Sequence, residues 1–243
     1  AGVIGVTEPA LHLADLLIAN SLETKQFLVS KGADDSKVTE VPPSIDEAFF
    51  QAQSRSQSNS VDHSFTVGCV GTAMTRKGFE IFLHTAFRFK QRFGAGNIRF
   101  VWVGSTLPMR GEAEWDVDKA GLGDMVSLVN DNRNISKILL DFDIYFCPSK
   151  EESFGLAPME AMATGCPVIA MSGSGAIERL THEAGGEIVP YFDVERIVDV
   201  IDQYRNDSDL LRQKGASAKS FAEAFTTDTV FQQWLEQLTA TLD

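Results

Sequence analysis

Short runs of apolar residues alternate with longer amphipathic stretches along most of this chain. Six runs have the length and the continuous apolar character of buried parallel strands, over residues 65–70, 98–103, 125–129, 144–147, 168–170 and 186–189. Helix-like segments separate them, and the segment over 79–92 repeats its apolar residues at helical spacing. This alternation predicts an α/β fold, a Rossmann-like parallel sheet of about six strands with helices on both faces. Such sheets bind ligands at the carboxyl ends of their strands.

The first 45 residues contain too few elements to bury a core of their own. Strands are predicted at 16–19 and 38–41. A helix is predicted between them, with Asn20 and Glu23 as its N-terminal capping pair and Gly32 at its end. Two short strands and one helix cannot exclude water from a hydrophobic core. We interpret residues 1–45 as the last part of a larger domain; the alternative is a short natural protein that never had the rest.

Polar composition marks a boundary after this segment. Residues 51–60 are polar and lack apolar periodicity, which is typical of a linker or a disordered loop. We therefore divide the chain into residues 1–45, a linker over 46–62, and a main domain over 63–243. The main domain is predicted to end in helices over 194–242.

Composition narrows the classes of function. The 243 residues are 44% hydrophobic, enough for a substantial core, and the net charge of −13 argues against a nucleic-acid surface. No apolar run reaches the length of a membrane span, and the N-terminus lacks the charged region of a signal peptide. The cysteines lie in apolar contexts, so we expect buried, reduced thiols in a cytoplasmic protein: Cys69, Cys147 and Cys166.

The most informative stretch runs from residue 150 to 175 and predicts a strand, loop, helix and strand. Pro158 fits only the first turn of a helix, which places the start of that helix near Gly155. Backbone N–H groups at a helix start favour an anion, and glycine allows the backbone to approach it closely. Glu160 is better suited to accept hydrogen bonds from hydroxyl groups, and Glu152 can reach another part of the ligand. A diphosphate placed between two polyols would satisfy all three groups.

This stretch resembles the donor-site motif of retaining GT-B glycosyltransferases of family 4. The matching residues are Glu152-Ser153-Phe154-Gly155-Leu156, Glu160-Ala161-Met162-Ala163, Gly165 and Pro167-Val168. The resemblance implies the C-terminal, donor-binding half of a GT-B enzyme, with residues 1–45 closing the N-terminal, acceptor-binding domain. It also implies that the parent enzyme transfers a sugar from a nucleotide diphosphate donor, UDP- or GDP-linked, with retention at the anomeric carbon. An isolated C-terminal piece is expected to be inactive alone.

The resemblance also implies the role of each site residue. Glu152 is the catalytic candidate, contacting hydroxyls of the donor sugar or stabilising positive charge at the anomeric carbon. Glu160 would hold the ribose hydroxyls. The N–H groups of Phe154, Gly155 and Leu156 would bind the diphosphate.

A second candidate for donor binding is Arg76-Lys77-Gly78, between the first main strand and the next helix. Two cations at a helix N-terminus oppose the helix dipole unless an anion is bound there; the alternative is a pair of solvent-exposed charges. Lys77 matches the lysine with which the family holds the pyrophosphate. The family arginine does not match, because Thr72 occupies its position, which leaves Arg76 as a substitute from another point of the loop.

Other motifs are interpreted as structural. Asp141-Phe142-Asp143 has the form of a metal-binding D-x-D motif but precedes a strand, at the end opposite the expected site. The histidines lack metal-ligand spacing, so neither a metal nor another cofactor is predicted. The loop over residues 172–175 matches a family loop near the donor, and Glu178 is interpreted as a cap or a surface charge outside the site.

Two other functions remain open at this stage. A non-catalytic module that binds nucleotide sugars is favoured by Thr72 and by the lack of an acceptor domain. A GT-B phosphorylase or epimerase is less consistent with the intact motif around Glu152. The acceptor is unknown, and the resemblance leaves open a parent protein that is peripheral to a membrane through the absent domain.

Overall fold

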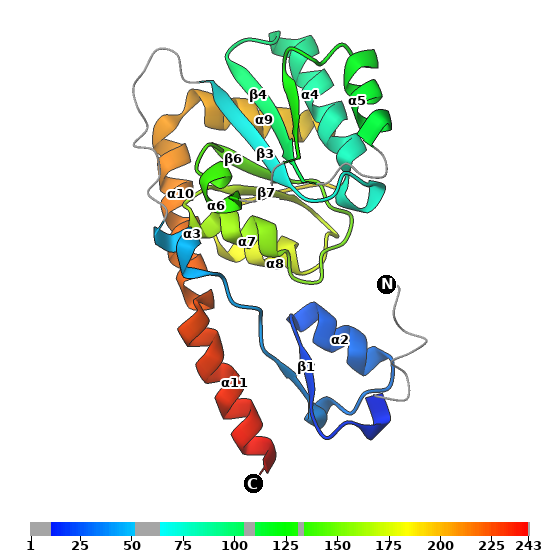
Figure 1. The fold of residues 1–243 in the computed structure, drawn as a ribbon, viewed down its shortest axis with the longest axis vertical. Helices are drawn as coiled ribbons and strands as arrows, with labels where there is room; N and C mark the ends of the chain where they lie inside the picture. Colours follow the sequence, from blue (N-terminus) through cyan, green and yellow to red (C-terminus); the bar gives the residue numbers. More distant parts are fainter. Residues whose placement is uncertain (1–10, 52–63, 105–109, 131–133, 243) are drawn as a thin grey trace.

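A computed structural model describes residues 11–51, 64–104, 110–130 and 134–242. Figure 1 shows an α/β body, with the N-terminal segment and the last helix extending from the same end of it. None of the helices in these ranges is both long and apolar enough to cross a membrane.

The body is built on one six-stranded sheet, as predicted. Its strands lie in the order β5-β4-β3-β6-β7-β8, and every neighbouring pair is parallel. Their bounds are β3 Phe65–Val70, β4 Ile98–Val103, β5 Val126–Val129, β6 Ile144–Cys147, β7 Val168–Met171 and β8 Glu187–Val189. These differ from the predicted ranges by at most one residue at an end. The chain order reverses between β3 and β6, which is where a parallel sheet opens a crevice for ligands.

Helices cover both faces of the sheet, which confirms the predicted layers (Figure 1). One face carries α4 Phe79–Phe93, α5 Arg110–Lys119 and α9 Val194–Asn206. The other carries α3 Glu47–Gln51, α6 Ile135–Leu139, α7 Leu156–Ala163, α8 Ala176–Glu183 and α10 Ser208–Ala222. Side chains of a strand alternate between the faces, so Trp102 packs in the first core and Val101 in the second.

Aromatic packing fixes α4 on the sheet. The ring of Phe82 lies 5.6 Å from that of Phe100, 5.2 Å from Trp102 and 6.3 Å from Phe146. Each such pair contributes about 0.5–1.5 kcal/mol beyond the burial of its area. Trp102 also donates its indole N–H to the carbonyl of Gly71 at 2.8 Å. The core therefore holds the loop that follows β3 at the carboxyl edge of the sheet.

The N-terminal segment is a small unit, as expected. Strands β1 Leu17–Ala19 and β2 Val38–Glu40 pair in parallel, with α2 Leu22–Ser30 and the short 3-10 helix η1 Asp35–Lys37 between them. The predicted capping pair is wrong. Ser21, in extended conformation, caps α2 by accepting from the Thr24 N–H at 3.1 Å, and Glu23 pairs with Arg179 of the body instead.

The segment predicted as a linker is partly helical. Helix α3 lies within residues 46–62, and its Phe49 and Phe50 pack against the second core. Lys219 of α10 donates to the carbonyl of Phe50 at 3.1 Å. Residues 52–62 of the predicted linker lie outside the described residues, so the domain boundaries stay a prediction.

The end of the chain is helical, as predicted. After α9 and α10 come the short 3-10 helix η3 Glu223–Phe225 and the final helix α11 Thr227–Leu242. All three cysteines are buried and free, which confirms the expectation of buried thiols.

The tight packing of β3 against the loop before β6 yields a stability prediction. A Cβ atom added to Gly68 would lie 2.1 Å from ring atoms of Phe142, so Gly68→Ala is expected to destabilise the fold by about 1–3 kcal/mol. The matched control is Gly111→Ala in α5, where no other atom lies within 4 Å of the added Cβ. Urea denaturation of both variants measures the difference; equal midpoints would contradict the packing.

Candidate functional site

The loops that follow β3, β6 and β7 meet at the carboxyl edge of the sheet. These strands are neighbours in space although β3 and β6 are far apart in the chain. The loop after β3 carries Lys77, the loop after β6 carries Glu152, and the loop after β7 carries Gly175. The sheet order therefore assembles the predicted donor-binding residues from separate parts of the sequence.

The centre of this edge is an ion pair between two predicted site residues. The Lys77 ammonium lies 2.5 Å from Oε1 of Glu152, and Ser149 donates its hydroxyl to the same oxygen at 2.7 Å. Only 9% of the Glu152 side chain is exposed, against 23% for Lys77. A buried carboxylate needs such partners, because its desolvation is costly. Sequence reasoning brought both residues to the site but did not predict that they pair.

The backbone of Glu152 is held by the loop that follows β7. Its N–H donates to the carbonyl of Ser174 at 2.8 Å, and its carbonyl accepts from the Ala176 N–H at 3.1 Å. Gly175 has a φ of +83°, and a Cβ there would lie 2.6 Å from the Glu152 carbonyl oxygen. Glycine is therefore required at this position, and the loop over 172–175 lies directly beside the catalytic candidate.

Helix α7 begins where the sequence predicted. Gly155 is its N-cap with a φ of +92°, and Pro158 lies in the first turn. No side chain among the described residues caps this N-terminus, which leaves its first N–H groups available to an anion. Phe154 is buried against Phe225, with ring centroids 5.7 Å apart, whereas Leu156 is largely exposed.

Arg76 lies at this edge but contacts protein backbone. It belongs to the short 3-10 helix η2 Thr75–Lys77, which precedes α4. Its guanidinium donates to the carbonyl of Glu151 at 3.2 Å, and its own carbonyl accepts from the Lys150 N–H at 2.9 Å. Arg76 therefore joins the loop after β3 to the loop that carries Glu152. Thr72, in the same loop, is half-buried.

Glu160 is in a different electrostatic position from Glu152. It lies in the second turn of α7 and is half-buried. Burial raises the pKa of its carboxyl group, and the negative charge of Asp46 raises the pKa further. The carboxylate form of Glu160 is thus disfavoured in the folded chain.

The residues around the D-x-D sequence form a structural contact. Asp143 accepts from the Thr66 N–H at 2.8 Å, and its own N–H donates to the Thr66 carbonyl at 2.9 Å. These bonds connect the amino ends of β3 and β6, so the motif lies at the end of the sheet opposite Glu152, as predicted. The part of the chain that the structure describes contains no cluster of three or more His, Cys, Asp or Glu side chains placed to hold a metal.

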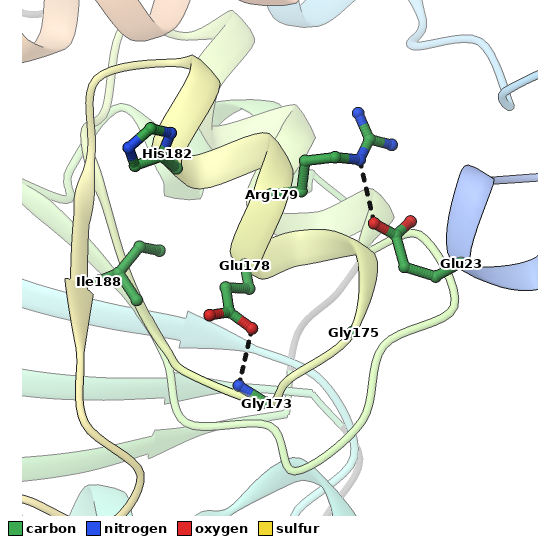
Figure 2. Close-up of a pocket in the computed structure, with 7 residues that line it drawn as sticks. All are labelled: Glu23, Gly173, Gly175, Glu178, Arg179, His182 and Ile188. Atoms are coloured by element: carbon green, nitrogen blue, oxygen red, sulfur yellow. Dashed lines mark hydrogen bonds and ion pairs between the residues drawn. The ribbon is translucent and has the colours of Figure 1, made fainter.

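An open pocket of about 590 Å³ is lined by Gly173 and Gly175 of the loop after β7, together with residues of α2, α8 and β8. Figure 2 shows Glu178 directed at the N–H of Gly173, which donates to it at 2.7 Å. It also shows Arg179 directed at Glu23 across the junction with the N-terminal segment, at 3.0 Å. Glu178 therefore connects the start of α8 to the loop that holds the backbone of Glu152, instead of capping the N-terminus of the helix at Gly175. The pocket itself was not predicted, because it combines residues from α2 and α8 that no local pattern connects.

Comparison with known proteins identifies the family of this chain. The family model described as "Glycosyl transferases group 1" matches residues 50–221. The chain is 30% identical to the lipopolysaccharide core biosynthesis mannosyltransferase LpsB of Rhizobium meliloti, covering 69% of this chain and 48% of that protein. It is 26% identical to a D-inositol 3-phosphate glycosyltransferase of Paenarthrobacter aurescens, covering 93% of this chain and 58% of that protein. The chain thus spans about half the length of the curated relatives it matches.

Solved structures agree on the fold. HepE from Anabaena, solved in complex with UDP and glucose, superposes with a TM-score of 0.81 at 21% identity, covering 97% of this chain and 68% of HepE. The family model covers most of the main domain, and the parallel sheet with its carboxyl-edge site is the arrangement that the motif implied. The chain belongs to the glycosyl transferases group 1 family and forms a C-terminal GT-B domain.

Proposed function

We propose that this domain binds a nucleotide diphosphate sugar and supports transfer of the sugar to an acceptor with retention of anomeric configuration. The observation that carries the proposal is the meeting of Lys77, Glu152 and the N-terminus of α7 at one carboxyl edge. A cation and free backbone N–H groups suit a diphosphate, and a carboxylate beside them suits sugar hydroxyls. The complex of HepE with UDP and glucose supports the same class of ligand.

Each group has a role in the proposed reaction. The bond between the anomeric carbon and the diphosphate oxygen breaks, and the acceptor oxygen bonds to that carbon from the same face. Negative charge grows on the departing diphosphate, where Lys77 and the N–H groups of residues 154–156 stabilise it. The departing phosphate takes the proton of the acceptor, so no enzymic base is required. Glu152 contacts the donor sugar, and Glu160 holds the ribose hydroxyls.

Arg76 has a smaller part in this proposal than sequence reasoning assigned to it. Its guanidinium already donates to the Glu151 carbonyl, so it braces the loop of Glu152. Contact of Arg76 with the diphosphate stays a prediction.

A second candidate is a module that binds the nucleotide sugar without transferring it. Thr72, at the position where the resembled family has an arginine, favours this reading, because one cation fewer would face the diphosphate. Turnover of a sugar nucleotide by the parent protein would exclude it. Cytoplasmic location stays a prediction under either function.

Lys77→Ala tests the diphosphate subsite. The variant is expected to bind UDP or GDP about 10- to 100-fold more weakly, because a charge-assisted hydrogen bond is lost. Affinity for uridine or guanosine should be unchanged, since a nucleoside has no phosphate. Calorimetry with each nucleotide and its nucleoside measures the two affinities. The matched control is Lys90→Ala, which removes a different ion-paired lysine, one that lies in α4. Equal losses for nucleotide and nucleoside would show that Lys77 does not face the phosphates.

Glu160→Gln separates function from stability. Nucleotide affinity should fall about tenfold, because the neutral amide accepts weaker hydrogen bonds from the ribose. Stability at pH 7 should be equal or higher, because the raised pKa of Glu160 means that ionisation weakens the wild-type fold. The advantage should be absent below about pH 4, where the carboxyl is mostly protonated in both folded and unfolded states. It should grow as the pH rises from the unfolded-state pKa to the higher folded-state pKa and stay constant above it.

Urea denaturation across this pH range and calorimetry with the nucleotide measure the two effects. Glu236→Gln, an exposed glutamate of α11, is the control and should change neither. A variant that lost stability at pH 7 yet kept its affinity would assign Glu160 a purely structural role.

We also propose that donor binding is independent of divalent cations. Nucleotide affinity should be the same in EDTA as in excess Mg²⁺. Asp143→Asn should lower stability by about 1 kcal/mol through its weakened bond to the Thr66 N–H, and should leave nucleotide affinity intact. Loss of affinity both in EDTA and in this variant would instead make Asp143 a metal ligand.

A further inference from the structure

Two site residues that a sugar nucleotide would have to engage are already engaged with each other. Oε1 of Glu152 is 2.5 Å from the Lys77 ammonium and accepts from the Ser149 hydroxyl at 2.7 Å. One oxygen of the carboxylate therefore carries both contacts. The ammonium of Lys77 is thus already paired with a carboxylate before any ligand arrives.

The loops that carry Lys77 and Glu152 are in close backbone contact. A Cβ atom on Gly78 would lie 2.0 Å from the carbonyl oxygen of Pro148. The Lys150 N–H donates to the carbonyl of Arg76 at 2.9 Å. Lys77 therefore reaches toward a diphosphate by side-chain rotation, while the backbone around Ser149 keeps its place.

The charge of Glu152 should affect the binding of a nucleoside diphosphate and of a sugar nucleotide differently. A nucleoside diphosphate that takes Lys77 leaves the buried charge of Glu152 with one partner fewer and places further negative charge beside it. A sugar nucleotide imposes the same loss, but its sugar hydroxyls can donate to the carboxylate and replace the ammonium. Binding of the sugar nucleotide thus replaces the partner that Glu152 loses, whereas binding of the free diphosphate does not.

We propose that Glu152 makes the site selective for a sugar nucleotide over the free nucleoside diphosphate, because its carboxylate competes with the diphosphate for Lys77. This inference rests on the proposed function and adds to it. Ser149 is only 2% exposed and donates its hydroxyl to Glu152. It is therefore the positioning residue that holds Glu152 when Lys77 turns to the phosphates. After transfer, the product diphosphate has lost its sugar, and the same competition favours its release.

The test is the affinity of the wild-type chain and of Glu152→Gln for two matched ligand pairs, UDP with UDP-glucose and GDP with GDP-mannose. Glutamine keeps the shape and an accepting oxygen but removes the charge. The variant should bind the free diphosphate about tenfold more tightly, because Lys77 is released and the repulsion is gone. It should bind the sugar nucleotide no more tightly than the wild-type chain, so the preference for the sugar nucleotide falls at least tenfold.

Further variants keep the result interpretable. Glu151→Gln changes the exposed glutamate next in the chain and should leave the preference unchanged. Ser149→Ala should weaken binding of the free diphosphate more than binding of the sugar nucleotide, because Glu152 then loses both Ser149 and Lys77 as partners unless sugar hydroxyls replace them. General loss of stability would not produce this split. In a Lys77→Ala background, Glu152→Gln should tighten diphosphate binding less than it does alone, because the competition has been removed.

The outcomes separate this inference from the proposed function. Wild-type binding of a sugar nucleotide, with an unchanged or weaker diphosphate affinity in Glu152→Gln, would overturn the selectivity and leave the donor site standing. Binding of neither ligand of either pair by the wild-type chain would overturn both.

Discussion

Burying a carboxylate is costly unless a cation or strong donors lie beside it, and the almost wholly buried Glu152 has both. Its partners come from the loop after β3 and from its own loop after β6, so the ion pair joins the two strands between which the sheet reverses its order. The backbone of Glu152 is bonded in turn to the loop after β7. Three loops of the carboxyl edge therefore depend on one side chain and its surroundings.

The two glutamates of the motif, Glu152 and Glu160, differ in how the protein compensates for the burial of their carboxyl groups. Glu152 is satisfied by protein groups, and a ligand must exchange with them. Burial and the negative charge of Asp46 together raise the pKa of Glu160. A ligand that donates hydrogen bonds to this carboxylate would therefore stabilise its charged form. In the proposed function, Glu152 would contribute selectivity through competition, and Glu160 would contribute affinity at some cost in stability.

The N-terminal segment is held to the body by polar contacts at a few points. Arg179 of α8 bonds Glu23 at 3.0 Å and lies 3.7 Å from Glu40, so it contacts both α2 and β2. Asn20 lies 3.4 Å from the hydroxyl of Ser153, beside the catalytic candidate. Partly exposed ion pairs of this kind contribute little net stability.

The sequence by itself determined the architecture of the sheet and predicted the residues of the candidate site. Continuous apolar runs separated by amphipathic segments were enough to predict six parallel strands and helices on both faces. The reason is that the spacing of apolar residues within each element indicates which of its side chains are buried. Pro158 and Gly155 located the start of α7 for the same local reason. The motif then indicated which side chains belong to the site.

Only the tertiary structure decided how those side chains meet. Lys77 and Glu152 are 75 residues apart, and their pairing follows from β3 and β6 being neighbours, an order that packing of the whole core selects. The cap of α2 was missed because Asn20 and Ser21 are both good capping residues, and the path of the chain into the helix chooses between them. Arg76 was expected to face a phosphate, yet its position opposite the Glu151 carbonyl depends on how two loops pack together. Such contacts join residues that no local pattern connects, so they are properties of the folded chain alone.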